Sequence, residues 1–173
     1  MLQETSDGLI VIGGSGPNTY ELDKGIGLII DVGGNDPYRD MIAASTDEDQ
    51  GDTVVINLNG DDTYHGAPLE LATGRLRVGL LIGLDGDDVY HLDMGSRGAG
   101  FGVLGLFIDE GGEDQYQSRS GFGDSSEKSM AGFFVLEGTD IYALPSTSST
   151  PANARPRDGG VFSYPQGDIV VDR

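Results

Sequence analysis

The chain contains no cysteine, and its basic residues are few. Without cysteine, a disulfide framework and a thiolate metal site are both excluded. Lys and Arg number 10 against 29 Asp and Glu, which gives a net charge of −19. Nucleic acids and anionic membranes are bound by basic faces, so we expect neither as a partner. The excess of carboxylates favours bound cations or simple solubility.

Long apolar runs are also missing. A run such as residues 103–108 is far too short to cross a bilayer, so we expect no membrane insertion. The start, Met1 to Glu4, shows neither the basic nor the apolar region of a secretory signal peptide. The chain has only two histidines, and no Ser/His/Asp or Cys/His signature stands out. At 173 residues it is long enough for one domain with its own core, and it favours a non-catalytic module over an enzyme.

Glycine is abundant, with 29 residues, and it recurs with Asp and Tyr in a fixed pattern. An anchor Asp recurs every 26 residues, at Asp36, Asp62, Asp88, Asp114 and Asp140. Two residues before each anchor lies a glycine: Gly34, Gly60, Gly86, Gly112 and Gly138. Two residues after it lies a tyrosine: Tyr38, Tyr64, Tyr90, Tyr116 and Tyr142. Six residues before it lies a large apolar residue: Ile30, Ile56, Ile82, Ile108 and Phe134. A fixed period kept in four columns indicates a repeat architecture.

The two ends of the chain depart from this pattern. Residues 10–20 form one more copy, in which Asn18 replaces Asp and the step to Asp36 is 18, as expected of a terminal cap. The repeat stops after residue 144. We therefore divide the chain into a repeat domain, residues 1–144, and a linker with a C-terminal capping segment, residues 145–173. A last strand near Ile169–Val171 would cover the open end.

Each copy joins an apolar run of Val, Ile, Leu and Phe to a Gly-Asp turn, which is a strand signal. With glycine this frequent, a 26-residue unit is too short for a strand, a helix and two loops, but it fits one coil of a parallel β-helix. We predict an all-β fold, a parallel β-helix or solenoid of about six coils of 26 residues with a shorter N-terminal coil. An antiparallel meander or sandwich is the alternative. In the β-helix the tyrosines stack as a ladder, and the Gly column takes positive φ at a corner.

The stacked Asp column needs something to offset its repulsion, because equivalent residues in neighbouring coils lie about 4.8 Å apart. Backbone N–H groups of the turns are one answer. Cations are the other, since a Ca²⁺–oxygen distance of about 2.4 Å places an ion midway between two stacked carboxylates. The columns one and five residues before the anchor supply further oxygen. The candidate metal ligands are Asp31, Asp36, Asp61, Asp62, Asp87, Asp88, Asp109, Asp114 and Asp140.

The turn sequences resemble those of a known family. Residues 59–64, Asn-Gly-Asp-Asp-Thr-Tyr, and residues 85–90, Asp-Gly-Asp-Asp-Val-Tyr, look like half of the RTX (haemolysin-type) calcium-binding nonapeptide. The resemblance implies that the anchor Asp side chains, with Gly carbonyls, bind Ca²⁺ between stacked turns. RTX motifs repeat every nine residues, whereas this pattern repeats every 26. The pattern is also similar to Gly- and Asp-rich repeats of bacterial proteins.

These observations lead to one preferred function and two alternatives. We expect a calcium-binding β-helix module without catalytic activity, a structural or adhesive part of an extracellular or cell-surface protein. The first alternative is a carbohydrate-active β-helix enzyme, a polysaccharide lyase or hydrolase, with a groove lined by Arg97 and Arg119. The second is an assembly module that self-associates through an exposed strand. The partners considered are therefore calcium, polysaccharide and a second copy of the chain.

Overall fold

The fold was analysed in a computed structural model of the whole chain. It describes residues 1–6, 8–22, 26–40, 52–66, 74–75, 78–92, 100–101, 104–118, 130–143, 161–163 and 169–172. All regular structure in these ranges is β-strand, with no helix among them. Accordingly, no helix within the described ranges is of a length and apolarity to cross a membrane. The predicted linker, residues 145–160, lies outside the described residues.

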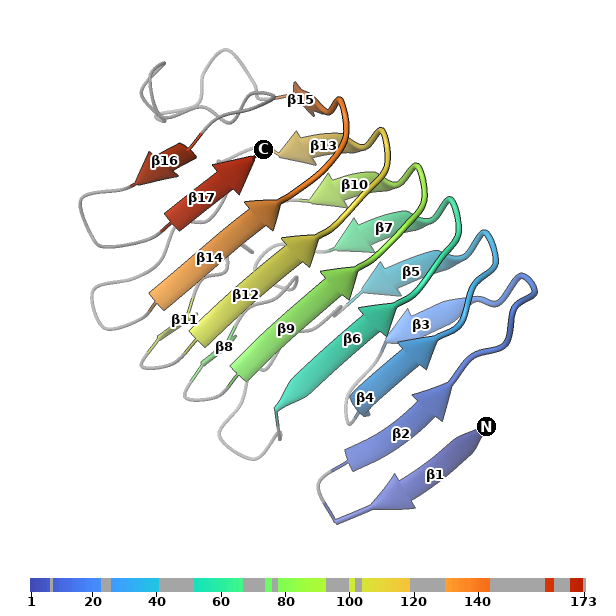
Figure 1. The fold of residues 1–173 in the computed structure, drawn as a ribbon. Coiled ribbons are helices and arrows are strands. Elements are labelled where there is room, and N and C mark those ends of the chain that lie inside the picture. Colours follow the sequence, from blue (N-terminus) through green and yellow to red (C-terminus); the bar gives the residue numbers. More distant parts are fainter. Residues whose placement is uncertain are drawn as a thin grey trace.

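Most strands belong to a nine-stranded sheet, which stands in front in Figure 1. Its order is β1 (Leu2–Thr5), β2 (Gly8–Ile12), β4 (Ile26–Asp31), β6 (Thr53–Asn57), β9 (Val78–Gly83), β12 (Leu104–Asp109), β14 (Met130–Val135), β17 (Ile169–Asp172) and β16 (Val161–Ser163). From β2 to β17 every neighbouring pair is parallel. At the two ends β1 and β16 pair antiparallel with their neighbours. The sequence pattern did not predict β1.

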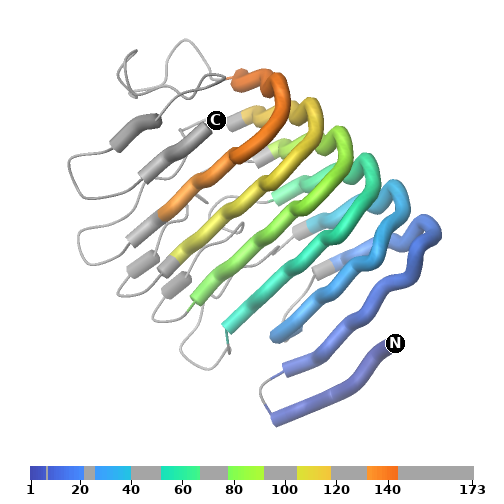
Figure 2. The backbone as a smooth tube through the Cα atoms, in the orientation of Figure 1, coloured from blue at the N-terminus to red at the C-terminus, as the bar shows by residue number. Residues whose placement is uncertain are grey.

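A six-stranded parallel sheet lies behind the first (Figure 1). Its order is β15 (Ile141–Ala143), β13 (Gln115–Ser118), β10 (Val89–Leu92), β7 (Thr63–Gly66), β5 (Pro37–Asp40) and β3 (Tyr20–Leu22). The short strands β8 (Gly74–Arg75) and β11 (Gly100–Phe101) form a third, parallel pair. The tube in Figure 2 shows the described segments as successive, similarly shaped turns. The all-β, solenoid-like prediction is therefore confirmed, and the antiparallel alternative is wrong.

The register places equivalent residues of the pattern side by side. Val55 pairs with Ile29 on one side and with Leu81 on the other, each 26 residues away. In the second sheet Tyr64 pairs with Tyr38 and Tyr90 with the same spacing. At the N-terminal end Tyr20 pairs with Tyr38 at a spacing of 18. This stacking turns each sequence column into a row of neighbouring side chains.

The corner between the two sheets depends on glycine. The predicted Gly column has φ between 130° and 138°, a region that side chains rarely adopt. A Cβ added to Gly86, for example, would clash with the carbonyl oxygen of Gly60 in the neighbouring coil, and it would lie 2.6 Å from the Gly60 carbonyl carbon. The coils therefore approach each other at the corner more closely than any residue other than glycine would allow.

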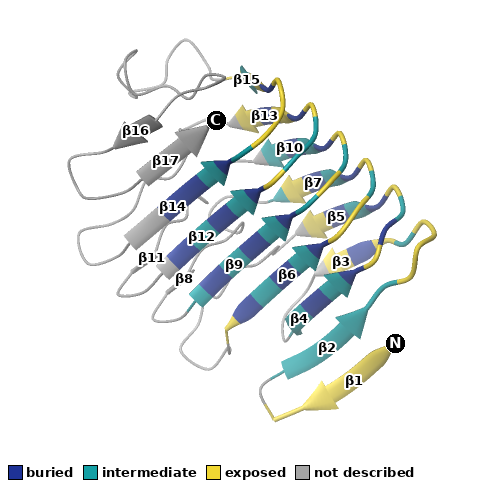
Figure 3. Cartoon of the chain, in the orientation of Figure 1, coloured by how far each residue is buried: buried dark blue, intermediate teal, exposed yellow. Residues whose placement is uncertain are grey.

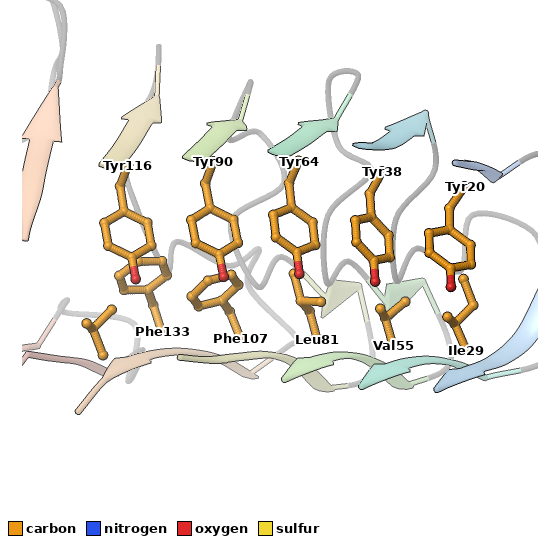
Figure 4. Packing of buried hydrophobic residues seen from close by; sticks show 11 residues of the cluster. Tyr20, Ile29, Tyr38, Val55, Tyr64, Leu81, Tyr90, Phe107, Tyr116 and Phe133 are labelled. Carbon is orange, nitrogen blue, oxygen red and sulfur yellow. The ribbon is translucent and has the colours of Figure 1, made fainter. Parts of the chain in front are cut away.

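The core lies between the two sheets and consists of two facing rows of side chains (Figure 4). The tyrosine rings of the six-stranded sheet form one row, stacked with centroids 4.6–5.0 Å apart. The facing row of the nine-stranded sheet is Ile29, Val55, Leu81, Phe107 and Phe133. Figure 3 shows buried and half-buried positions alternating along these strands. The predicted tyrosine ladder is confirmed, and its hydroxyl groups point across the core.

Candidate metal centre

The anchor carboxylates lie inside the molecule, immediately before the strands of the six-stranded sheet. Their exposed fractions are between 1% and 8% for Asp36, Asp62, Asp88, Asp114 and Asp140. The preceding glycine turns the chain inward at this point, so the anchor side chain points towards the core rather than to solvent. A buried carboxylate is costly unless it is hydrogen-bonded, protonated or bound to a cation.

Each anchor carboxylate accepts a hydrogen bond from the backbone N–H of the anchor one coil earlier. The N···Oδ1 distances are 2.6 Å from Asp36 to Asp62, 2.8 Å from Asp62 to Asp88, 2.7 Å from Asp88 to Asp114 and 2.9 Å from Asp114 to Asp140. Backbone N–H groups therefore offset part of the repulsion between the stacked carboxylates. This is the first of the two explanations considered from the sequence. The donors lie in the neighbouring coil and not in the same turn, so the column also fixes the register between coils.

Asn18 begins this ladder and explains the departure from Asp in the first copy. Its backbone N–H donates to Asp36 Oδ1 at 2.5 Å. Its side-chain amide donates to the carbonyl oxygen of Gly16 at 2.7 Å. An ionised carboxylate could not donate this second bond. The substitution therefore suits the end of the ladder.

A second inner column stands at the carboxyl ends of the strands of the nine-stranded sheet. In order of coils it contains Gly13, Asp31, Asn57, Gly83, Asp109 and Val135. No two neighbouring coils both place a carboxylate in this column. Asp31 accepts a hydrogen bond from the Tyr38 hydroxyl at 2.8 Å. Asn57 instead donates to the Tyr64 hydroxyl at 2.8 Å and also to Asp62. The alternation limits repulsion in a place where solvent cannot screen it.

The two columns meet at Asp88, Asp109 and Asp114. One carboxylate oxygen from each lies within 4.8 Å of the others, and all three residues are buried. The Tyr90 hydroxyl contacts Asp88 Oδ2 at 2.9 Å and Asp109 Oδ2 at 2.6 Å. The Tyr116 hydroxyl contacts Asp109 Oδ2 at 2.9 Å and Asp114 Oδ2 at 3.3 Å. This cluster of carboxyl and hydroxyl oxygens could hold a metal ion.

The hydroxyl contacts indicate how protons are shared within the cluster. Each tyrosine hydroxyl carries one proton and can donate only one hydrogen bond, yet Tyr90 and Tyr116 each contact two carboxyl groups. When each hydroxyl donates a single two-centre bond, a protonated carboxyl group is the donor in its other contact. About two of the three carboxyl groups are therefore protonated when no cation is bound.

The electrostatic surroundings agree with this count. Burial, with the nearby charge of Asp109 adding to it, raises the pKa of Asp88 to about 9 and that of Asp114 to about 8. Burial also raises the pKa of Asp109. Further along the ladder burial raises the pKa of Asp62 to about 6.

No Lys or Arg side chain that the structure describes lies near the cluster to offset its charge. Among the described side chains Arg39 alone is Arg or Lys. It is half-exposed and lies 3.9 Å from Glu21 on the outer surface. Within the described part of the chain, protons or a cation are left to balance the charge of the buried carboxylates.

The remaining predicted ligands lie elsewhere. Asp31 and Asp36 belong to the first coils, Asp62 lies one coil before Asp88, and Asp140 one coil after Asp114. Asp61 and Asp87 are exposed at the corner and belong to an outer ladder. The Asp87 N–H donates to Asp61 Oδ1 at 3.2 Å, so this ladder runs opposite to the inner one.

Sequence reasoning did not include the hydroxyl groups of Tyr90 and Tyr116 among the site residues. The fixed spacing of two residues between each anchor Asp and its tyrosine was the signal that could have found them. Residues two apart on an extended chain share a face, so the hydroxyl and the carboxyl group point into the same space. Arg97 and Arg119, predicted for a carbohydrate groove, lie outside the described residues.

The two histidines form a separate pair on the outer surface of the six-stranded sheet. The rings of His65 and His91 stack with centroids 4.6 Å apart and planes 10° apart. His91 Nδ1 lies 3.1 Å from Gln117 Oε1 in the next coil. Desolvation, then the charges of His91 and Arg39, lower the pKa of His65. Parallel stacked rings direct their nitrogen lone pairs side by side, so they do not converge on one ion.

Comparison of the chain with protein-family models, with curated proteins and with solved structures gave no match. Function must therefore be argued from the geometry of the site.

Proposed function

We propose that this protein is a calcium-binding β-helix module without catalytic activity, made of about six coils of 26 residues with a shorter first coil. The observation that carries the proposal is the buried cluster of Asp88, Asp109 and Asp114. Burying three carboxylates in a core costs considerable electrostatic free energy, and a bound cation offsets that cost directly.

The chemistry of the cluster favours calcium among the common metal ions. Its facing groups are carboxyl and hydroxyl oxygens, which are the ligands of hard cations and not of zinc or copper. Two oxygens that bind one Ca²⁺ at about 2.4 Å can lie at most about 4.8 Å apart. The separation of the three carboxylate oxygens stays within that limit. Magnesium, at about 2.1 Å, would require a tighter and more regular set of oxygens.

Calcium would compete with protons for this cluster. By the count above, the cluster holds about two carboxyl protons. A dication that takes the same oxygens would release them, so the charge of the site would change little on binding. Calcium would thus take the place of the carboxyl protons in the core.

The rest of the molecule suits a structural role. The ladders of backbone and side-chain hydrogen bonds make each coil a template for the next, which favours a stiff spacer or a binding scaffold. Sites on extracellular modules bind Ca²⁺ in the range of about 10⁻⁴–10⁻³ M. We therefore place the module on a secreted or cell-surface protein.

Thermal unfolding with and without calcium tests the proposal. Saturating Ca²⁺ is expected to raise the melting temperature of EDTA-stripped protein by several degrees. Asp109→Asn should abolish the shift, and Asn is already accommodated in this column at Asn57. Asp85→Asn removes the same charge from the exposed corner and should keep the shift. No shift in the unaltered protein, or an equal loss in both variants, would contradict a site at Asp109.

A further inference from the structure

The nine-stranded sheet has an outer face that the core does not use. Along β6, Val55 points inward and is fully buried, while Val54 and Ile56 point outward and are only half-buried. The described strands leave this face open in front in Figures 1 and 3. The described side chains on this face are therefore available for contact with a partner.

The outer face is apolar over most of its described area, and exposed Asp52, just before β6, is an acid at its edge. Three columns of side chains cross it, and all are half-buried or exposed. The first column is Ile10, Leu28, Val54, Leu80 and Leu106. The second is Ile12, Ile30, Ile56, Ile82, Ile108 and Phe134. The third, just past the strand ends, is Val32, Leu58, Leu84 and Leu136, with Glu110 as its one charged residue.

Two comparisons show that the apolar composition is specific to the outer face of the nine-stranded sheet. The outer face of the six-stranded sheet carries polar and charged residues, among them Arg39, His65, His91 and Gln117. In the third column Val32 and Leu58 remain 45% and 36% exposed. Monomers rarely expose apolar patches beyond a few hundred Å², and larger ones mark interaction sites. The face thus has the composition of an interface in a protein that is otherwise strongly acidic.

The size and regularity of the face indicate what covers it. Six strands spaced by about 4.8 Å and columns spaced by about 6.6 Å give a flat area of about 600 Å² once side-chain width is included. A stable interface buries about 800 Å² of accessible surface per partner. The accessible surface of the side chains that stand on this flat area approaches that value. A second copy presents the same spacings of rows and columns, so its ridges match the grooves of this face.

We propose that the outer face of the nine-stranded sheet is a homodimer interface, on which a second copy packs face to face with its strands antiparallel. In such a dimer the two-fold axis lies between the sheets and runs along the direction in which the coils stack. Residues of the middle column, such as Ile56 and Ile82, then contact their own counterparts.

The exposed acids at the corner favour the dimer with antiparallel strands over the dimer with parallel strands. Asp61, Asp85 and Asp87 line the corner at one edge of the aliphatic face. With strands antiparallel, the corners of the two copies lie at opposite edges, separated by more than the width of the face. With strands parallel, they would lie along one edge, close to the screening length of about 8 Å. Repulsion between the acidic corners therefore disfavours the parallel dimer.

Analytical ultracentrifugation tests the dimer. The unaltered protein should dimerise in a concentration-dependent manner, more tightly at high salt because screening reduces the repulsion of two highly acidic chains. Ile82→Lys, in the middle of the face, should weaken dimerisation at least tenfold. Val89→Lys places the same residue on the outer face of the six-stranded sheet and should change it less than twofold. Thermal unfolding confirms that both variants fold. A protein that stays monomeric at several hundred micromolar and high salt would overturn the proposal, as would equal weakening by both variants.

The chain has no cysteine, so single cysteines can report the arrangement. Spin labels on Asp85→Cys should lie farther apart than the width of the face, about 20 Å, in the antiparallel dimer. Labels on Ile56→Cys, in the middle column, should lie close together. Close labels at position 85 would overturn the antiparallel arrangement.

Discussion

Adding a single methyl group at the corner, by a glycine-to-alanine substitution, should show whether the coils stack closely there or form a loose turn. Gly111 and Gly112 are consecutive in the turn between β12 and β13. Gly112 has φ +136°, and an added Cβ would overlap the Gly86 carbonyl oxygen and lie 2.8 Å from its carbon. A Cβ on Gly111 would meet only the Leu84 carbonyl oxygen, at an ordinary 3.7 Å. The two neighbouring glycines therefore form a matched pair.

The expected difference can be estimated from the two penalties at Gly112. A non-glycine residue in a disfavoured backbone region costs about 1–3 kcal/mol. Overpacking costs about 1–3 kcal/mol more, and here the neighbour is backbone, which cannot rotate away. Gly112→Ala should therefore lose about 2–6 kcal/mol of unfolding free energy. Gly111→Ala should change it by less than about 1 kcal/mol, with a favourable contribution from the unfolded chain.

Urea unfolding followed by circular dichroism measures both variants under one set of conditions. The two alanine variants should differ in midpoint at a similar slope. Equal midpoints would refute the close approach of the coils at the corner, and with it the ladder of hydrogen bonds from Asp88 to Asp114.

Three further predictions concern the inner ladder. In EDTA, the unfolding free energy should fall as the pH rises from 5 to 9. Asp88 and Asp114 have pKa values raised to about 9 and about 8, so their contribution is complete below the unfolded value of about 3.9 and is lost as the pH rises through 8 to 9. Each group contributes a slope of up to about 1.4 kcal/mol per pH unit, and urea midpoints that rise with pH would contradict this. Tyr90→Phe keeps the ring stack but removes the hydroxyl between Asp88 and Asp109, and should lose about 1–3 kcal/mol in the same assay; an unchanged midpoint would count against the proton arrangement. Asn18→Asp replaces a donor by a carboxylate and should lower the melting temperature at pH 8 more than at pH 5, whereas an equal effect would exclude a charge effect.

Much of the fold could be predicted because the repeat period determines the register. Once residues 26 apart are stacked, the tyrosines must form a row and the glycines must share one corner conformation. The strand β1 escaped prediction because Leu2–Thr5, which pairs with β2, carries no copy of the pattern.

The candidate site was less predictable because it depends on directions within a turn. Asp61 and Asp62 are adjacent in the sequence, yet the first is exposed and the second buried. On a strand, adjacent side chains point to opposite faces, which would explain this difference in exposure. These two residues lie in a turn, however, where the direction of a side chain follows from the conformation of the preceding glycine. The direction of the amide donors and the second contact of each tyrosine hydroxyl likewise depend on coil-to-coil geometry, which no single copy encodes.

The calcium site is the central claim, and calorimetric titration of Ca²⁺ into EDTA-stripped protein tests it most directly. The titration is performed at pH 7 in two buffers that differ in ionisation enthalpy, with Mg²⁺ as the control and Asp109→Asn as the matched variant. The account predicts binding selective for Ca²⁺ and absent from the variant. It also predicts release of about two protons per ion, because the ion replaces the carboxyl protons shared with Tyr90 and Tyr116. Absence of binding, or binding that persists in Asp109→Asn without proton release, would contradict it.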